Sequence, residues 1–197
     1  MSAKNLPASV ERSSPAAGSG WAAIPDSGVI LGVDPGSLKT GFGALRRRGL
    51  DVLWIHSGRL RPPRRAALIP RLGWLHDEFG ELLDELRPVA VAVETSYVGR
   101  NMRAALTLGQ ARGVLIAAAT RRKLPVLEFS PAEIKLSVVG HGTASKHQIQ
   151  DMVPRLIDGL EHELNEDEAD ALAVALCCIQ RRVREEWHDR PPSRNAP

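Results

Sequence analysis

The sequence contains very little cysteine. Of its 197 residues, only Cys177 and Cys178 are cysteines, and they are neighbours within a stretch of helical pattern. Because adjacent residues on a helix point in different directions, we interpret both as small buried hydrophobic residues. The pattern excludes a disulfide framework and a zinc-binding spacing. It suits a reducing compartment, so we expect a cytoplasmic protein.

The chain also lacks a long apolar segment and internal repeats. No apolar run is long enough to span a bilayer, so we expect no membrane association. Residues 1–27 lack the apolar core of a signal peptide and are rich in Ser, Ala, Gly and Pro, which predicts a disordered extension. Residues 187–197 have a similar composition and predict a disordered tail. One folded domain is therefore expected over residues 28–186.

The charge of the chain is mildly positive and unevenly distributed. Lys and Arg number 26 against 23 Asp and Glu, which gives a formal net charge of +3. Basic residues gather in two regions: Arg46, Arg47, Arg48, Arg59, Arg61, Arg64, Arg65 and Arg71, and then Arg100, Arg103, Arg112, Arg121, Arg122 and Lys123. Such groups usually form solvated faces, but repeated arginine favours phosphate, which the planar guanidinium binds through two parallel hydrogen bonds. A polyanionic partner is therefore permitted.

The hydrophobic pattern predicts a mixed α/β fold. Strands are expected over residues 29–34, 39–47, 50–60, 89–94 and 125–129, and helices over 68–86 and 101–121. The second helix is apolar nearly all round at "GVLIAAA", so we expect it to be deeply packed. Three later helix starts carry capping signals, at Ser130, Ser145 and Asn165. This order implies a five-stranded mixed sheet with helices on both faces.

The stretch "VILGVDPGSLKTGFGAL", residues 29–45, joins the first two strands. Asp34 ends the first, buried strand. Pro35 fixes φ and Gly36 permits a positive φ, so we expect a sharp turn here. Gly41 and Gly43 leave room in the second strand for a ligand or another backbone to approach. A plain hairpin with a capping aspartate is the simpler interpretation.

Four carboxylates lie where a carboxylate is costly. Asp34 and Glu94 end apolar strands, and Asp167 and Asp170 share one face at the start of an apolar helix. Stabilisation by the helix dipole would explain Asp167 without any function, and cationic partners distant in sequence remain an alternative. A cluster of oxygen ligands otherwise selects Mg²⁺ or Mn²⁺. Two such ions together typically serve in-line displacement at phosphorus, here of a nucleic-acid phosphodiester.

Four segments resemble the RuvC family of Holliday junction endonucleases. They are "ILGVDPGSLKTGFG", "VAVETSYVGRNMRAALTLGQARGV", "IKLSVVGHGTASKHQI" and "DEADALAVAL", in that order, and the match spans roughly residues 29–182. The resemblance implies the RNase H-like fold. It also implies that Asp34, Glu94, Asp167 and Asp170 are the catalytic metal ligands. The expected cofactor is Mg²⁺, with two ions per active site and Mn²⁺ able to substitute. Glu166 or Glu168 could compete with Asp167 as the third ligand.

The resemblance further implies how DNA is bound. Tyr97, the only tyrosine in the chain, occupies the position of an aromatic residue that stacks on junction bases, with ordinary partial burial as the alternative. Arg100, Lys135 and Lys146 are assigned to DNA binding, although each lysine could be a solvated helix residue. A homodimer is implied, because a four-way junction has two-fold symmetry. A branch-migration helicase complex of the RuvA–RuvB type is a further implied partner.

Two other classes of protein compete with this interpretation. A sugar-kinase or actin-like ATPase also places Asp-x-Gly between two strands, but the chain is too short for two lobes and has no second such hairpin. A non-catalytic nucleic-acid-binding module with the same fold is the other alternative. The four intact carboxylates argue against that second alternative.

Overall fold

The computed structural model describes residues 27–49, 51–95 and 101–188, with the side chains of 185–188 excepted. The elements in chain order are β1 (Val29–Asp34), β2 (Thr40–Arg48), β3 (Asp51–Leu60), α1 (Leu68–Leu86), β4 (Ala90–Glu94), α2 (Met102–Arg121), β5 (Val126–Phe129), α3 (Pro131–Val139), α4 (Lys146–Met152), a 3₁₀ turn (Val153–Leu156) and α5 (Glu166–His188). The expected disordered ends, 1–27 and 187–197, lie almost wholly outside the described residues, so they stay predictions.

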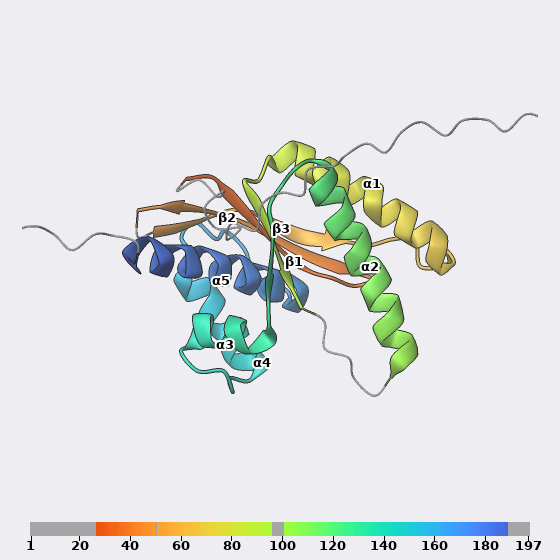
Figure 1. The fold of residues 1–197 in the computed structure, drawn as a ribbon. Helices are drawn as coiled ribbons and strands as arrows, with labels where there is room; N and C mark the ends of the chain where they lie inside the picture. The colour runs from red at the N-terminus through yellow and green to blue at the C-terminus, as the bar shows by residue number, and fades with distance from the viewer. Residues whose placement is uncertain (1–26, 50, 96–100, 189–197) are drawn as a thin grey trace, which may run out of the picture.

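The strands form a five-stranded mixed sheet, as the sequence predicts, and the structure gives their order as β3-β2-β1-β4-β5 (Figure 1). The first three strands form an antiparallel meander, whereas β4 and β5 run parallel to β1. Because β1 and β4 are parallel neighbours, their carboxyl ends meet at the same edge of the sheet. Val33 pairs with Val93, which places Asp34 and Glu94 side by side at that edge.

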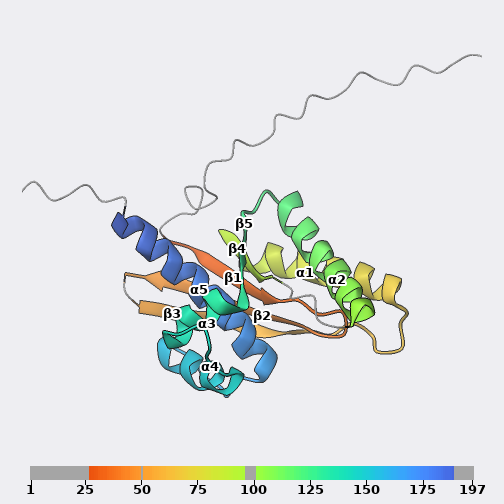
Figure 2. The ribbon, with the colours of Figure 1, turned by 60° about the horizontal axis from the view of Figure 1, so that its bottom comes forward.

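Helices cover both faces of the sheet, and β4 is buried on both sides (Figure 2). Val91 and Val93 belong to the cluster that α1 and α2 cover, while Ala90 and Ala92 belong to the cluster built on α3, α4 and α5. The expected division of "VAVAVE" into a valine face and an alanine face is therefore confirmed. Small alanines on one face match the close approach of α5 to the sheet.

Helix α2 is less deeply packed than the sequence predicts. Its buried side chains are those of Ala111, Leu115, Ala118 and Ala119. On its outer face Met102 is 73% exposed and Leu106 is 66% exposed. The expectation of deep packing all round was wrong, because the helix covers the sheet with one face only. An apolar strip of this helix is left in solvent.

Glycines in β1 and β2 allow α5 to lie directly on the sheet. A Cβ on Gly32 would stand 2.1 Å from the carbonyl oxygen of Ala171, and one on Gly41 would stand 2.1 Å from that of Asp167. A Cβ on Gly43 would meet the Leu172 side chain at 2.6 Å. The expected close approach of another backbone is thus confirmed. The space at Gly41 and Gly43 is filled by α5 and is not left open for a ligand.

The turn after Asp34 is tight for a different reason from the expected one. Gly36 does not have a positive φ. Its hydrogen is needed because a Cβ there would stand 2.1 Å from the Lys39 carbonyl oxygen. The buried Thr40 hydroxyl donates a hydrogen bond to the Gly36 carbonyl (2.8 Å) and accepts one from the Gly36 amide (3.2 Å). These bonds hold the loop that connects β1 to β2.

The three predicted helix starts are confirmed. Ser130 with Glu133, and Ser145 with Gln148, each form a reciprocal capping box. The Glu168 amide donates to the Asn165 side chain at 3.3 Å, and the Asn165 amide donates to the Glu168 carboxylate at 3.1 Å. These last two bonds fix the residue at which α5 begins, just before Asp167 and Asp170.

The structure also tests the prediction for the two cysteines. Cys177 and Cys178 are buried free thiols in α5, as expected. In the described ranges, none of the helices has the length and apolar character needed to cross a membrane.

Candidate active site

Three elements bring the four predicted carboxylates to one edge of the sheet. Asp34 ends β1, Glu94 ends the neighbouring β4, and Asp167 and Asp170 lie in the first turns of α5. Asp34 stands opposite Gly41 in the β1–β2 ladder, and the backbone of Asp167 rests on Gly41. The carboxylate of Asp34 is accordingly close enough to Asp170, Glu94 and Asp167 for electrostatic repulsion. The structure therefore brings the four acids to the same edge of the sheet, while their role as metal ligands stays a prediction.

Burial and mutual repulsion raise the pKa of three of these acids. Burial, followed by the charges of Asp170, Glu94 and Asp167, raises the pKa of Asp34 to about 7. Burial is also the main cause that raises the pKa of Glu94 and of Asp170. Each of these carboxylates is therefore costly to ionise until positive charge comes near it.

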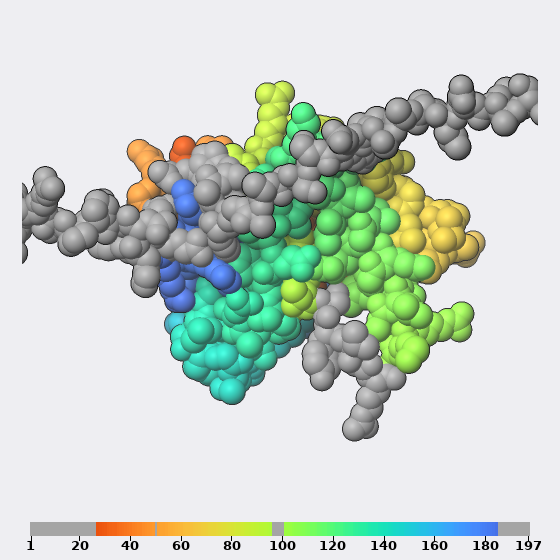
Figure 3. All heavy atoms as spheres, in the orientation of Figure 1, coloured from red at the N-terminus to blue at the C-terminus, as the bar shows by residue number. Residues whose placement is uncertain are grey.

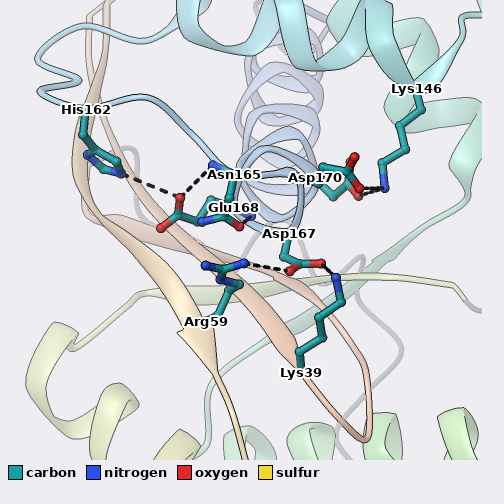
Figure 4. A network of polar contacts seen from close by, with 9 residues as sticks. Lys39, Arg59, Lys146, His162, Asn165, Asp167, Glu168 and Asp170 are labelled. Carbon is teal, nitrogen blue, oxygen red and sulfur yellow. Dashed lines mark hydrogen bonds and ion pairs between the residues drawn. The ribbon is translucent and has the colours of Figure 1, made fainter.

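The donor set fits a hard divalent cation. It consists of oxygen atoms alone, and the repulsion at Asp34 is of the kind that a bound cation relieves. Within the described residues, no three His, Cys, Asp or Glu side chains form a metal-binding group as they stand. Lysines contact two of the acids instead (Figure 4). The residues thus match such an ion in charge and chemistry, and their present arrangement is that of carboxylates paired with ammonium groups.

Lys135 and Lys146 lie beside the acids, in a cleft of about 180 Å³ lined by Glu94, Pro131, Ile134, Lys135, Lys146, Ile149, Asp170 and Ala173. The Lys146 ammonium lies 2.9 Å from Asp170 and 3.3 Å from Glu166, and its hydrogen bond with Asp170 raises the pKa of the lysine. The charge of Lys135 acts to lower the pKa of Glu94, against the burial that raises it. The structure therefore brings both lysines to the site, while their contact with DNA stays a prediction.

Asp167 has two cationic partners that the sequence analysis did not identify. The Lys39 ammonium lies 2.6 Å from one oxygen of the carboxylate, and the Arg59 guanidinium lies 3.6 Å from the other. Arg59 pairs with Gly41 across the β2–β3 ladder, so Asp34, Gly41 and Arg59 lie in one row across three strands. A spatial partner was an open alternative and is present for both Asp167 and Asp170. The one available signal was that Lys39 falls inside the "DPGSLKTGFG" motif.

The two glutamates that could replace Asp167 have other partners. Glu168 caps α5 through Asn165 and lies 3.7 Å from the His162 ring (Figure 4). The side chain of Glu166 is 67% exposed and pairs with Lys146. Among Glu166, Asp167 and Glu168, only Asp167 has a charge that contributes to the raised pKa of Asp34. The geometry therefore favours Asp167 as the third member of the cluster.

The predicted residues Tyr97 and Arg100 lie outside the described residues. On one side of them, the Thr95 amide and hydroxyl donate to the Phe129 carbonyl at 2.8 and 3.2 Å. On the other side, the Asn101 side chain caps α2 by accepting from the Ala104 amide at 3.0 Å. In Figure 3 the end of β4 lies between α3 and α4 on one side and α2 on the other. The segment with Tyr97 thus begins next to Glu94.

Comparisons with known proteins show which family the sequence matches. The family model described as crossover junction endodeoxyribonuclease RuvC matches residues 30–178. The protein of that name from Protochlamydia amoebophila is 43% identical over 155 residues, which cover 79% of this chain and 92% of the relative.

Solved structures agree as well. The structure of T. thermophilus RuvC in complex with a Holliday junction substrate has a TM-score of 0.73 at 31% identity, covering 80% of this chain and 96% of that one. The yeast mitochondrial Holliday junction resolvase Ydc2 shares the fold, with a TM-score of 0.62 at 13% identity and coverage of 84% and 85%. Since the family model spans more than half of the sequence and a relative 43% identical covers 79% of it, the chain belongs to the RuvC family of crossover junction endodeoxyribonucleases.

Proposed function

We propose that this protein resolves four-way (Holliday) DNA junctions by metal-dependent hydrolysis of phosphodiesters, with Asp34, Glu94, Asp167 and Asp170 as the metal ligands. The observation that carries the proposal is the convergence of these carboxylates, at which repulsion and burial raise the pKa of Asp34 to about 7. Membership of the RuvC family, and likeness to a member bound to a junction, support DNA junctions as the substrate.

The ion proposed for this site is Mg²⁺, two per active site, with Mn²⁺ able to replace it. Bound there, the ions would supply an activated water and stabilise the leaving oxygen at phosphorus. The four acids would hold the ions, and the positive charge of the ions would offset the repulsion between the ionised carboxylates. Asp34, which burial and three neighbouring carboxylates affect most, gains the most from a bound cation.

The chain's basic and aromatic residues would position the strand. Lys135 and Lys146 line the cleft beside Glu94 and Asp170, where they can bind phosphate oxygens. For Tyr97 we propose stacking on an unpaired junction base, and for Arg100 a phosphate contact. Both roles follow from the family resemblance and from the start of their segment next to Glu94.

We further propose that the protein works as a homodimer. A four-way junction is two-fold symmetric, so two copies can cut opposite strands of one junction. The exposed strip of α2, with Met102 and Leu106 outward and open space above Gly109 and Gly113, is the apolar surface we assign to this contact. A branch-migration helicase complex of the RuvA–RuvB type remains a proposed partner from the resemblance, as does a cytoplasmic location.

The experiment that tests this function compares substrates and ions. With Mg²⁺ or Mn²⁺, the protein should cut a synthetic four-way junction on two opposing strands and leave linear duplex of the same sequence intact. Ca²⁺ should support binding without cleavage, because its larger and looser coordination misplaces the attacking water. Strong cleavage in EDTA would refute the metal-dependent mechanism. Hydrolysis of ATP without junction cleavage would favour the ATPase alternative.

A further inference from the structure

Two groups of basic residues flank the acid cluster, and they come from different parts of the fold. Lys146 comes from α4 and contacts Asp170, with Lys135 of α3 in the same cleft. Lys39 comes from the loop between β1 and β2 and contacts Asp167. Figure 4 shows the two lysines reaching the start of α5 from opposite sides. A strand laid across the acids would meet positive charge on both sides.

The two cations on Asp167 differ in exposure. The Lys39 side chain is 56% exposed, whereas that of Arg59 is 30% exposed and that of Asp167 only 9%. The lysine stands at the solvent side of the carboxylate and carries a flexible stem with a compact charge. Arg59 extends from β3, an edge strand of the sheet, where it pairs with Gly41 of β2. If Lys39 turned to another anion, the buried carboxylate would keep Arg59 as a partner.

We propose that Lys39 is a substrate-contacting residue that binds a backbone phosphate of the DNA strand, on the side of the acid cluster opposite Lys135 and Lys146. Asp167 holds the ammonium at the mouth of the site before DNA arrives. Arg59 then keeps the Asp167 carboxylate paired when Lys39 engages the phosphate. The assignment deepens the proposed function and rests on it, because it takes nucleic acid as the substrate.

The test measures junction affinity as a function of salt in Ca²⁺, under which no strand is cut. Each phosphate contact contributes roughly 0.7–0.9 to the slope of log affinity against log salt. Lys39→Met should lower that slope by about this amount and weaken binding about two- to fivefold. The control is Arg184→Met, which removes an exposed basic residue near the end of α5 that is remote from Asp167 and Asp170. It should leave both the slope and the affinity unchanged.

A double-mutant cycle separates a phosphate contact from an effect through Asp167. If Lys39 acts only by neutralising or positioning the Asp167 carboxylate, Lys39→Met should have no further effect on junction binding once Asp167 is replaced by Asn. Adding Lys39→Met to the Asp167→Asn background should still lower the salt slope by about 0.7–0.9 if Lys39 binds phosphate. If the double variant has the same salt slope as Asp167→Asn alone, the proposal is overturned. A melting temperature for each variant confirms that all four proteins are folded.

The outcomes also separate this proposal from the function on which it rests. If the wild-type protein does not prefer four-way junctions to duplex, the proposed function fails whatever Lys39 does. If the wild type binds and cuts junctions while Lys39→Met behaves like Arg184→Met, only the assignment of Lys39 fails.

Discussion

The backbone carbonyl of Asp167 lies against Gly41, so close that a Cβ on the glycine would stand 2.1 Å from its oxygen. Gly41 in turn stands opposite Asp34 on one side and Arg59 on the other. A single residue without a side chain therefore brings an acid from α5 next to an acid from β1. The spacing of the acid cluster depends on how closely the helix approaches the sheet at this position.

Replacing this glycine tests that dependence. Gly41→Ala should lower the free energy of unfolding by about 1–3 kcal/mol, because the backbone of α5 has to move away from the added methyl group. Junction cleavage should fall with it, since Asp167 moves together with the helix. Thermal or denaturant unfolding and a nicking assay measure the two effects.

The control for this variant is Gly73→Ala in α1, where nothing lies within 4 Å of the added Cβ. It should stabilise the protein by up to about 1 kcal/mol, because alanine favours helix over glycine. Wild-type cleavage by Gly41→Ala would show that the acids tolerate a shift of α5.

The raised pKa of Asp34 predicts how the stability of the metal-free protein depends on pH. Folding raises this pKa from 3.8 to about 7, so the folded state holds the proton more tightly than the unfolded chain. The stabilisation is fully present below about pH 4 and is lost as pH rises through about 7. With chelator present, the contribution of Asp34 should therefore fall between about pH 4 and pH 7.

Asp34→Asn should remove this part of the pH dependence. The measurement is the melting temperature of both proteins, with EDTA, across that pH range. Mg²⁺ should raise the wild-type melting temperature most at high pH, where the acids are ionised. Parallel curves for the wild type and Asp34→Asn in EDTA would contradict the assigned pKa.

Tyr97 tests junction recognition separately from the chemistry. Base–aromatic stacking is worth about 1–3 kcal/mol per base, so Tyr97→Ala should slow junction cleavage about ten- to hundredfold. Tyr97→Phe should be nearly neutral, since the ring carries the stacking. On a junction with mismatched central bases, whose strands are already unpaired, the alanine variant should recover part of its rate. Wild-type rates for Tyr97→Ala on intact junctions would leave the tyrosine without this role.

The exposed strip of α2 predicts the dimer contact. Leu106→Glu places a charge on a side chain that is 66% exposed in the single chain, so the monomer should fold normally while dimerisation weakens. Sedimentation should show a shift toward monomer, and paired cuts on one junction should become single nicks. Arg103→Glu, at an exposed position three residues earlier in the same helix, controls for charge. An unchanged dimer in Leu106→Glu would place the interface elsewhere.

Most of the fold could be predicted because local patterns and global packing agree. The alternation in "VAVAVE" predicts burial on both faces, and the helix caps at Ser130, Ser145 and Asn165 are read from residues three apart. The burial of α2 could not be predicted this way. An apolar helix surface looks the same in sequence whether it faces the core or, as at Met102 and Leu106, faces away from it.

The acid cluster could be predicted because a carboxylate is costly to bury, and each of the four lies at the end or the start of an apolar strand or helix. Its cationic partners could not be, because Lys39 reaches Asp167 from the loop between β1 and β2 while Arg59 reaches it from β3, and only the folded sheet brings these segments together. The role of Gly36 was misread for a similar reason. Whether a glycine serves a positive φ or a close contact depends on backbone atoms that the sequence pattern does not place.

The most direct test of the central claim measures cleavage and binding of one junction by the same variants. If the acids hold metal while basic residues hold DNA, then Asp34→Asn, Glu94→Gln and Asp170→Asn should each abolish cleavage in Mg²⁺. Each should also bind the junction as tightly as the wild type in gel-shift assays, or more tightly, because a repulsive charge has been removed. Full cleavage by any one of these variants would remove that residue from the site, and full cleavage by all three would contradict the account.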